Sequence, residues 1–259
     1  MNDQPVISVE GVDKTFPGKD GVQALRGIDL TVGEGDFVSL LGPSGCGKST
    51  LLRIMADLTE PTAGSVRVNG KPAAAARRDR DYGMVFQQPG LLDWRTVARN
   101  VELPLQVMGV AKAERRERAR AMLDLVRLPD SQRRFPWQLS GGMQQRAAIA
   151  RALAPEPRIL LMDEPLSALD EMNREHLQGE LLRIWSDTGT TVVMVTHSIA
   201  EAVFLSTRVV VMSPRPGRVA GTVDVDLPGR RTAATRNTPE FFEQVTKVRT
   251  MLHGVLEAA

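Results

Sequence analysis

The sequence predicts an α/β fold built on a mostly parallel sheet. Short apolar runs of strand length alternate with stretches of helical spacing, and this alternation resumes after a block of helical patterns. Apolar strands of this kind are typical of a parallel sheet covered by helices on both faces. A glycine-rich stretch that joins one such strand to a helix, beginning at Gly42, fits the same class.

Most strands are expected in the first part of the chain. The continuous apolar run 37–41 leads directly into a helix expected over 48–58, where residues 51, 52, 54, 55 and 58 are apolar. Asn69-Gly70 is a turn signal after a short strand. A loop rich in Gly, Lys and Asp separates the first two strands. The strands expected here are 6–9, 27–32, 37–41, 65–68 and 82–86.

The block from about 90 to 155 predicts an inserted helical subdomain. Within 111–128, Ala119, Met122, Leu123 and Val126 recur at i, i+3, i+4 and i+7. We therefore expect a core of residues 1–89 and 156–225, a helical subdomain of 90–155, and a tail of 226–259 with a terminal helix. The expected helices are 97–108, 111–128, 141–153, 171–186, 199–205 and 240–252, and the later strands are 158–162, 190–196, 208–212 and 219–225.

Composition argues against nucleic acid as a partner and favours a reducing compartment. The 259 residues carry a formal net charge of +2, which is too weak a field to attract nucleic acid. The single cysteine, Cys46, excludes an internal disulfide. Residues 1–5 lack the features of a secretory signal, and no apolar run approaches the roughly 18 residues that a membrane span needs. We expect a soluble, cytoplasmic protein.

A phosphate-binding loop is the most specific motif. Residues 42–49 fit G-x-x-x-x-G-K-[ST] between an apolar strand and a helix, which is the context that this motif requires. Backbone N–H groups of the loop would surround phosphates, Lys48 would reach the β- and γ-phosphates, and Ser49 would ligate Mg²⁺. The alternative is a glycine-rich loop without a ligand. The loop residues are Gly42, Pro43, Ser44, Gly45, Cys46, Gly47, Lys48, Ser49 and Thr50.

Two acidic residues follow the apolar strand 159–162. Asp163 is placed to hold Mg²⁺ through its water shell, and Glu164 is the candidate general base for an attacking water. A helix N-cap with a polar neighbour is the alternative interpretation. The phosphate-binding loop elsewhere in the chain favours the catalytic one.

A second candidate phosphate site opens the helix expected at 141–153. Ser140 can cap that helix, and the free amides of Gly141 and Gly142 face whatever lies in front of it. One helix N-terminus stabilises an anion by only about 0.3–2 kcal/mol. It can therefore complete a nucleotide site but cannot hold ATP unaided. A plain Ser-Gly-Gly helix start is the alternative.

Four weaker signals each have an ordinary structural explanation. Gln87 follows a strand and precedes Gln88-Pro89, so it can be an ordinary turn residue. His197 follows the strand 190–196 and can be a structural histidine. Asp170 can be a simple helix cap, and Phe16, which we expect in a loop, can be a packing residue. The other two histidines, His176 and His253, give no metal-binding spacing with His197.

Taken together, these motifs resemble an ATP-binding cassette (ABC) nucleotide-binding subunit over about residues 6–215. The resemblance implies a P-loop NTPase (RecA-like), mostly parallel sheet core with an antiparallel N-terminal β subdomain and an inserted α-helical subdomain. It implies Walker A at 42–50, a Q-loop at Gln87, the signature at 139–143, Walker B at 159–164, a D-loop at 167–170 and a switch histidine at His197. Phe16 matches the aromatic residue that stacks on adenine.

The resemblance also implies cofactors and partners. Two such subunits form a head-to-tail homodimer that binds ATP and Mg²⁺ between Walker A of one subunit and the signature of the other. Integral membrane permease subunits and, indirectly, a solute-binding protein complete such an importer at the cytoplasmic face of a bacterial membrane. Met143 departs from the consensus, which has Gln there, so we do not expect the side-chain hydrogen bond of that Gln at this position.

Three runs are similar to a narrower group, the nitrate/sulfonate/taurine importers, which also includes importers for pyrimidine precursors. They are 86–97, 195–205 and 212–218. The first contains Leu91, Leu92 and Trp94, which either dock a cytoplasmic helix of the permease or belong to the core of the helical subdomain. Competing functions are a non-transport ABC ATPase acting on nucleic acid or ribosomes, and a P-loop kinase, which has no use for residues 139–142.

Overall fold

The computed structural model describes residues 5–18, 21–227 and 231–257. A six-stranded sheet has the order β10-β9-β3-β8-β7-β6, in which β9, β3, β8, β7 and β6 are parallel and β10 is antiparallel to β9. Its strands are β3 (Phe37–Leu41), β6 (Tyr82–Val85), β7 (Ile159–Asp163), β8 (Thr191–Val195), β9 (Arg208–Met212) and β10 (Val219–Asp224). Every residue of β3, β7 and β8 is buried, which explains their continuous apolar pattern.

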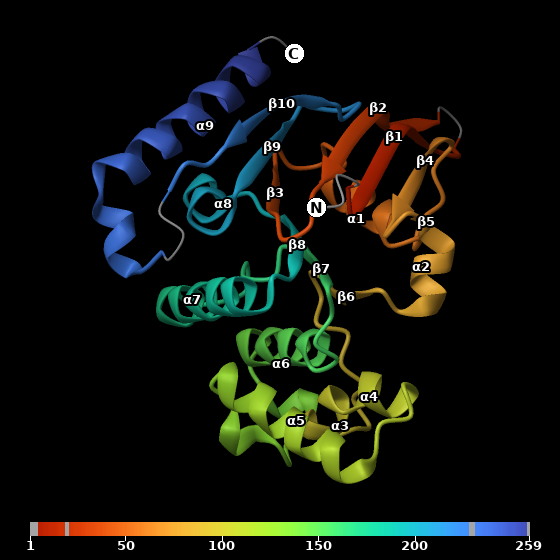
Figure 1. The fold of residues 1–259 in the computed structure, drawn as a ribbon, viewed down its shortest axis with the longest axis vertical. Helices are drawn as coiled ribbons and strands as arrows, with labels where there is room; N and C mark the ends of the chain where they lie inside the picture. The colour runs from red at the N-terminus through yellow and green to blue at the C-terminus, as the bar shows by residue number, and fades with distance from the viewer. Residues whose placement is uncertain (1–4, 19–20, 228–230, 258–259) are drawn as a thin grey trace.

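A smaller antiparallel sheet lies beside the first (Figure 1). Its order is β2-β1-β4-β5, formed by β1 (Ile7–Phe16), β2 (Val22–Val32), β4 (Ala63–Val68) and β5 (Lys71–Pro72). Helix α1 (Lys48–Met55) packs between the two sheets, with Leu51, Leu52, Ile54 and Met55 buried in a core to which both sheets contribute. Helix α2 (Ala73–Asp79) follows β5.

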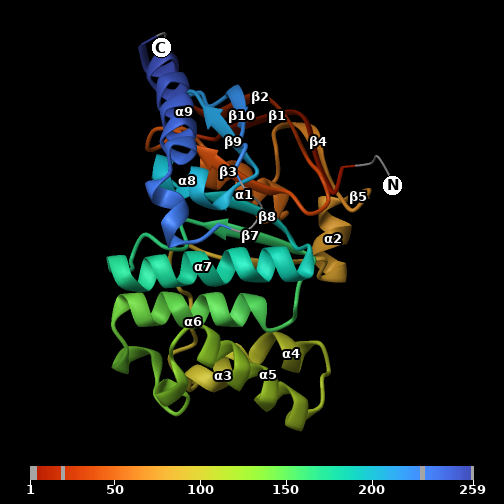
Figure 2. The same ribbon diagram turned by 60° about the vertical axis from the view of Figure 1, so that its left-hand side comes forward.

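The inserted helices form a separate layer, seen at the bottom of Figures 1 and 2. Helix α6 is the uppermost of this layer and lies next to α7, which covers the larger sheet (Figure 2). The layer contains α3 (Val97–Val101), α4 (Leu103–Val107), α5 (Lys112–Leu125), two short 3-10 turns (Pro129–Ser131 and Pro136–Gln138) and α6 (Gly141–Leu153). The fold class predicted above is therefore confirmed, while the exact domain boundaries stay a prediction.

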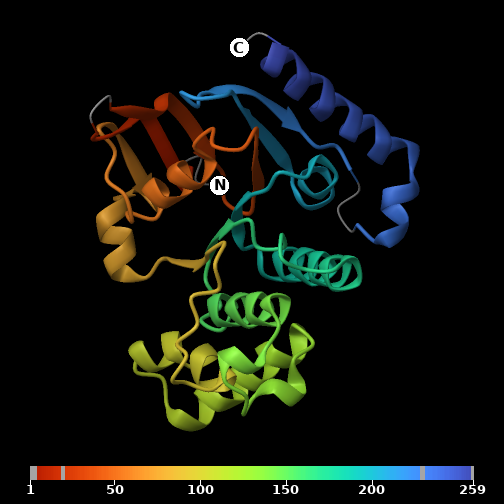
Figure 3. The same ribbon diagram turned by 180° about the vertical axis from the view of Figure 1, so that it is seen from behind.

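The remaining helices lie along the later part of the chain. They are α7 (Glu171–Thr188), α8 (Ile199–Leu205), the 3-10 turn η3 (Ala233–Asn237) and α9 (Pro239–Glu257). Seen from behind in Figure 3, α9 runs along β10 and α8, away from the inserted helices. Phe241, Val245 and Val248 bury one face of α9 in the main core, the apolar cluster formed by the larger sheet, the inserted helices, α7 and α8. Among the described residues, no helix is long and apolar enough to cross a membrane.

Several elements differ from expectation for identifiable reasons. The first two strands extend to Phe16 and back to Val22, so Phe16 ends a strand rather than lying in a loop. The helix expected over 97–108 is divided into α3 and α4, with Pro104 in the first turn of α4, because proline cannot donate a helical hydrogen bond. Helix α1 ends at Met55, and Asp57 then has a positive φ of 48°. Neither α2 nor β5 was predicted.

Candidate active site

The loop between β3 and α1 requires glycine at particular positions. Gly45 and Gly47 have φ values of +75° and +100°, which L side chains rarely adopt. A Cβ on Gly47 would lie 2.6 Å from Leu25 Cδ2 and 2.9 Å from the carbonyl oxygen of Ala24. The loop is therefore held tightly against β2, and its backbone shape depends on these glycines.

Lys48 places a buried ammonium inside this loop. The side chain is nearly inaccessible, and Nζ donates to the carbonyl oxygens of Gly42 at 2.7 Å and Pro43 at 2.9 Å. A buried ammonium must have hydrogen-bond partners, and here the loop itself supplies them. A charged oxygen of an incoming anion would be a stronger partner than either carbonyl.

Asp163 ends β7 beneath the start of α1. Its side chain is fully buried, and its Oδ1 accepts a hydrogen bond from Ser49 Oγ at 2.6 Å. Its Oδ2 is buried and has no hydrogen-bond partner among the described residues, and the guanidinium of Arg53 lies 4.0 Å away. A buried carboxylate oxygen without a partner is unfavourable, so this atom is available to a further ligand.

Two side chains that follow other strands, Gln87 and His197, approach one carboxylate oxygen of Glu164. Gln87 Nε2 donates to Glu164 Oε2 at 3.2 Å, and His197 Nδ1 lies 3.7 Å from the same oxygen. Glu164 has a φ of +46°, a backbone conformation unfavourable for a residue with a Cβ. Its N–H donates to the carbonyl oxygen of Val195 at 3.1 Å, so β8 fixes the turn after β7. Such strained positions cluster at active sites.

An open pocket of about 640 Å³ joins these groups. It is lined both by the candidate phosphate-binding loop and by Gln87, Glu164 and His197, so the structure brings together motifs that are far apart in the sequence. Phe16 lies in this lining with 39% of its surface exposed, and Lys14 Nζ lies 5.0 Å from the centre of its ring. The lining residues are Phe16, Val22, Ala24, Ser44, Gly45, Gly47, Lys48, Ser49, Thr50, Gln87, Glu164, His197 and Arg215.

Arg215 was not among the predicted site residues. Its guanidinium lies 3.4 Å from the carbonyl oxygen of Gly45, so it adds a cation beside the phosphate-binding loop. Gly217 explains how its segment reaches the loop, because a Cβ there would lie 1.9 Å from the carbonyl oxygen of Cys46. The run 212–218 was already noticeable in the sequence, but nothing in it indicates this contact.

The second candidate phosphate site lies elsewhere in the chain. Ser140 caps α6, and its Oγ accepts from the N–H of Met143 at 3.3 Å. Ser140 and Gly141 are exposed, and neither lines the pocket around Lys48. In Figure 1, α6 lies in the helical layer while α1 lies beside the sheets. The Met143 side chain is half-buried and packs against the main core.

Helix α6 also holds the segment that contains Gln87. Gln145 Nε2 donates to the carbonyl oxygen of Phe86 at 3.0 Å. Arg151 donates to the carbonyl oxygens of Pro89 at 2.7 Å and Gly90 at 2.6 Å, and burial lowers the pKa of its guanidinium. The two ends of the segment are thus attached to the same helix, whose N-terminus is the Ser140 site.

Comparisons with known proteins identify the family of this chain. A sequence profile of the family described as ABC transporter matches residues 25–167. An uncharacterized ABC transporter ATP-binding protein of Methanocaldococcus jannaschii is 48% identical over 247 residues, covering 95% of this chain and 91% of that protein.

Two similar proteins have named transport functions. The taurine import ATP-binding protein TauB of Yersinia pestis is 44% identical over 243 residues, covering 92% of this chain and 93% of its own length. The nitrate import ATP-binding protein NrtD of Synechocystis is 41% identical over 255 residues, covering 96% of this chain and 95% of its own length.

A solved structure shares the fold. The ATP-binding cassette MJ0796, in a dimeric post-hydrolysis state bound to ADP and Pi, superposes with a TM-score of 0.80 and 37% identity. The match covers 86% of this chain and all of that one. The chain therefore belongs to the ABC transporter ATP-binding proteins, ATPases that couple ATP hydrolysis to transport.

Proposed function

We propose that this protein is the ATPase subunit of an importer for a small solute of the sulfonate, taurine or nitrate kind, bound to the cytoplasmic face of a bacterial membrane. The observation that carries the proposal is the near full-length similarity to both TauB and NrtD. The cassette itself does not contact the solute, so the test uses the partner subunits. The permease and solute-binding protein are purified with the cassette, and the binding protein is screened by thermal shift.

The screen compares sulfonates, nitrate and pyrimidines under the same conditions. We expect stabilisation of the binding protein by a sulfonate or by nitrate, because ligand binding to the folded state raises its stability. Stabilisation by pyrimidines alone would contradict the proposed solute class. It would leave the ATPase assignment unaffected.

A head-to-tail homodimer would explain why the chain has two separate candidate phosphate sites. The Ser140 end of α6 does not line the pocket around Lys48, and a helix end alone contributes only about 0.3–2 kcal/mol to anion binding. In a dimer, this end of one subunit would complete the ATP site of the other. The dimeric MJ0796 structure with ADP and Pi supports the arrangement.

The residues around Asp163 fit a hard divalent cation such as Mg²⁺. The donor atoms present are oxygens, and Asp163 Oδ2 is buried without a hydrogen-bond partner. Mg²⁺ prefers oxygen ligands and keeps part of its water shell. Ser49 would be a direct ligand, with Asp163 and Gln87 contributing from the adjacent strand ends. When bound, the ion would neutralise charge on the β- and γ-phosphates.

Glu164 is proposed as the general base that takes a proton from the attacking water. Its Oε2 already accepts from Gln87, and His197 lies within 3.7 Å, so the carboxylate is oriented from two sides. Gln87 would report the state of this site to α6 through the attached segment 86–90. The His197 imidazole would hold the γ-phosphate side of the pocket together with Lys48.

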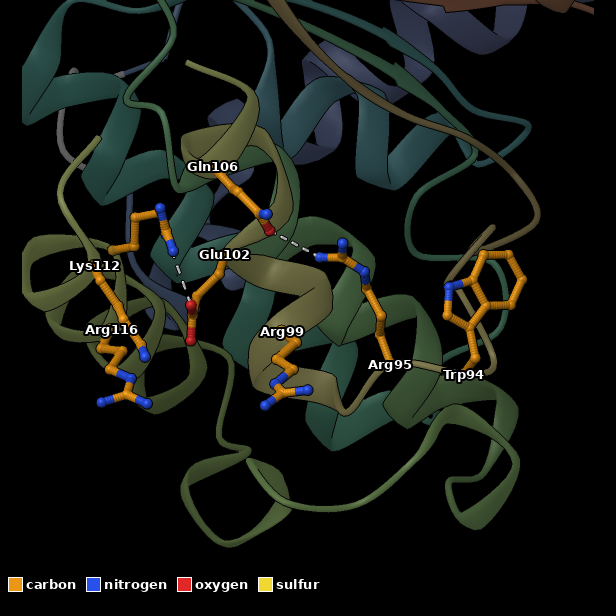
Figure 4. A pocket seen from close by; sticks show the side chains of 8 residues that line it. Trp94, Arg95, Arg99, Glu102, Gln106, Lys112 and Arg116 are labelled. Atoms are coloured by element: carbon orange, nitrogen blue, oxygen red, sulfur yellow. Dashed lines mark hydrogen bonds and ion pairs between the residues drawn. The ribbon is translucent and has the colours of Figure 1, made fainter. Parts of the chain in front are cut away.

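A surface near Trp94 is proposed to dock the permease. Leu91, Leu92 and Trp94 differ in their surroundings. Leu91 packs against the main core, Leu92 is half-buried, and Trp94 is 75% exposed. Trp94 stands beside a pocket of about 400 Å³ that carries five cationic side chains and one acidic side chain (Figure 4). Charge complementarity favours a partner segment with acidic side chains. The lining is Trp94, Arg95, Arg99, Glu102, Gln106, Lys112, Arg115 and Arg116.

Trp94→Ala is expected to abolish most transport while leaving the ATPase rate of the isolated cassette within about twofold of the parent. An exposed indole at an interface often contributes 2 kcal/mol or more to binding, about thirtyfold in affinity. The measurement pairs solute uptake into proteoliposomes with phosphate release by the free cassette. Phe242→Ala removes another exposed aromatic, on α9, and serves as the matched control. Equal loss of both activities would contradict a role confined to docking.

A further inference from the structure

The segment before α9 reaches the candidate switch histidine through a buried hydrogen-bonded chain. In Figures 1 and 2 this segment lies at the lower end of α9, near α7. Arg236, on the 3-10 turn η3, donates to Gln178 Oε1 on α7, and Gln178 Nε2 donates to Glu201 Oε1 on α8 at 3.1 Å. Because both ends of the Gln178 amide are occupied, its orientation is determined by Arg236 on one side and Glu201 on the other.

The chain continues from Glu201 to the residues on either side of His197. Glu201 Oε2 accepts from Thr196 Oγ1, and that same hydroxyl oxygen accepts from the N–H of Ser198 at 3.1 Å. Gln178, Glu201 and Thr196 are all at least nine-tenths buried. In a low-dielectric interior such a network is rigid when every member has its partner.

The His197 side chain is held by few direct contacts with the described residues. Its side chain is 64% exposed, and the ion-pair distance to Glu164 is a long 3.7 Å. The position of the imidazole therefore depends on the backbone of residues 196–198, which the Thr196 hydroxyl bridges. A change in the buried chain would move His197 relative to Glu164.

The tail is attached to α8 at further points. Arg231 Nη1 donates to the carbonyl oxygens of Val203, Phe204 and Ser206, between 2.8 and 3.2 Å, at the C-terminus of α8. The guanidinium of Arg236 also lies 3.7 Å from the centre of the Phe204 ring. The N-terminus of the same short helix follows His197, so the tail contacts the C-terminal end of α8 directly and its first turn, at Glu201, through Gln178.

We propose that the C-terminal segment, through Arg236, positions His197 for ATP hydrolysis. Arg236 is a positioning residue here, acting through Gln178, Glu201 and Thr196. It does not line the pocket around Lys48, but it lines a neighbouring pocket together with Glu164 and His197. The inference rests on the role proposed above for His197. It gives residues 231–237 a function that none of the sequence motifs indicated, and it makes this segment a place where a partner could change the hydrolysis rate.

Arg236→Ala is expected to lower kcat for ATP hydrolysis by about tenfold, since sub-ångström misplacement of a catalytic group has effects of this order. The dissociation constant of ATP should stay within about twofold, because Lys48 and its loop are untouched. Arg236→Lys keeps a cation within reach of Gln178 and should recover most of the rate. Lys247→Ala, an exposed cation on α9, is the control for removing charge from the tail.

A proton NMR titration separates positioning from general destabilisation. The chain has only three histidines, so the imidazole resonances are few, and His197→Ala assigns the one of interest. We expect Arg236→Ala to move or broaden the His197 resonance and to leave that of His176 in place. Equal losses of kcat, ATP affinity and thermal stability, with both resonances changed, would overturn the proposal in favour of a merely structural role.

A double-mutant cycle with His197→Ala completes the test. If Arg236 acts through His197, Arg236→Ala should have little further effect on kcat in the His197→Ala background. A full tenfold loss in that background, or a parent-like rate and His197 resonance in the single variant, would overturn the inference. If His197→Ala alone hydrolyses ATP at the parent rate, the proposed role of His197 fails instead, and the NMR result still decides whether the tail positions that side chain.

Discussion

Glu164→Gln is expected to reduce kcat for ATP hydrolysis by roughly 10²–10⁴-fold while ATP still binds. Glutamine has the shape of glutamate, so the contacts with Gln87 and His197 can persist, but an amide oxygen cannot take a proton from water at neutral pH. The loss corresponds to roughly 3–5 kcal/mol of transition-state stabilisation. Because hydrolysis would no longer open the proposed dimer, ATP should hold it closed.

The measurement combines phosphate release with size-exclusion chromatography in the presence and absence of ATP. Glu114→Gln is a matched control, since Glu114 is an exposed acid on α5 paired with Arg118. We expect an ATP-dependent dimer for Glu164→Gln and ordinary turnover for the control. Hydrolysis at the parent rate by Glu164→Gln would show that another group is the base.

Lys48→Ala is expected to weaken ATP binding by about 10–100-fold. A hydrogen bond to a charged partner contributes about 1.5–3 kcal/mol, and the ammonium of Lys48 is the one buried cation within the loop among the described residues. Within the loop, the remaining contacts would be backbone amides and the dipole of α1, which alone stabilise an anion only weakly. Isothermal calorimetry with ATP measures the change.

The substitution also removes the partner of two loop carbonyls, those of Gly42 and Pro43. Thermal unfolding should therefore be recorded beside the calorimetry, so that a collapsed loop is distinguished from a lost phosphate contact. Lys71→Ala, which removes an exposed lysine paired with Asp79, is the control. Unchanged ATP affinity in a stably folded Lys48→Ala variant would refute the phosphate-binding role of this loop.

Elements with strong local signals were predictable to the residue. Helices α6 and α8 begin at serine caps, and their observed ranges, 141–153 and 199–205, are those expected from the sequence. Strand β9, an apolar run bounded by polar residues, was predicted equally well. Prediction failed where the signal was short or mixed, as for α2 within an alanine-rich stretch and for the break at Pro104.

The sequence by itself determined which residues are candidates for the proposed chemistry, since the candidate phosphate-binding loop, Asp163-Glu164 and the Ser140 helix start are contiguous motifs whose spacing is set by the local backbone. Only the tertiary structure decided which of these motifs meet. The strand order places Gln87, Glu164 and His197 around one oxygen atom and leaves the end of α6 outside that pocket. Arg215 and Arg236 contribute through contacts between residues far apart in the chain, and no local pattern encodes such contacts.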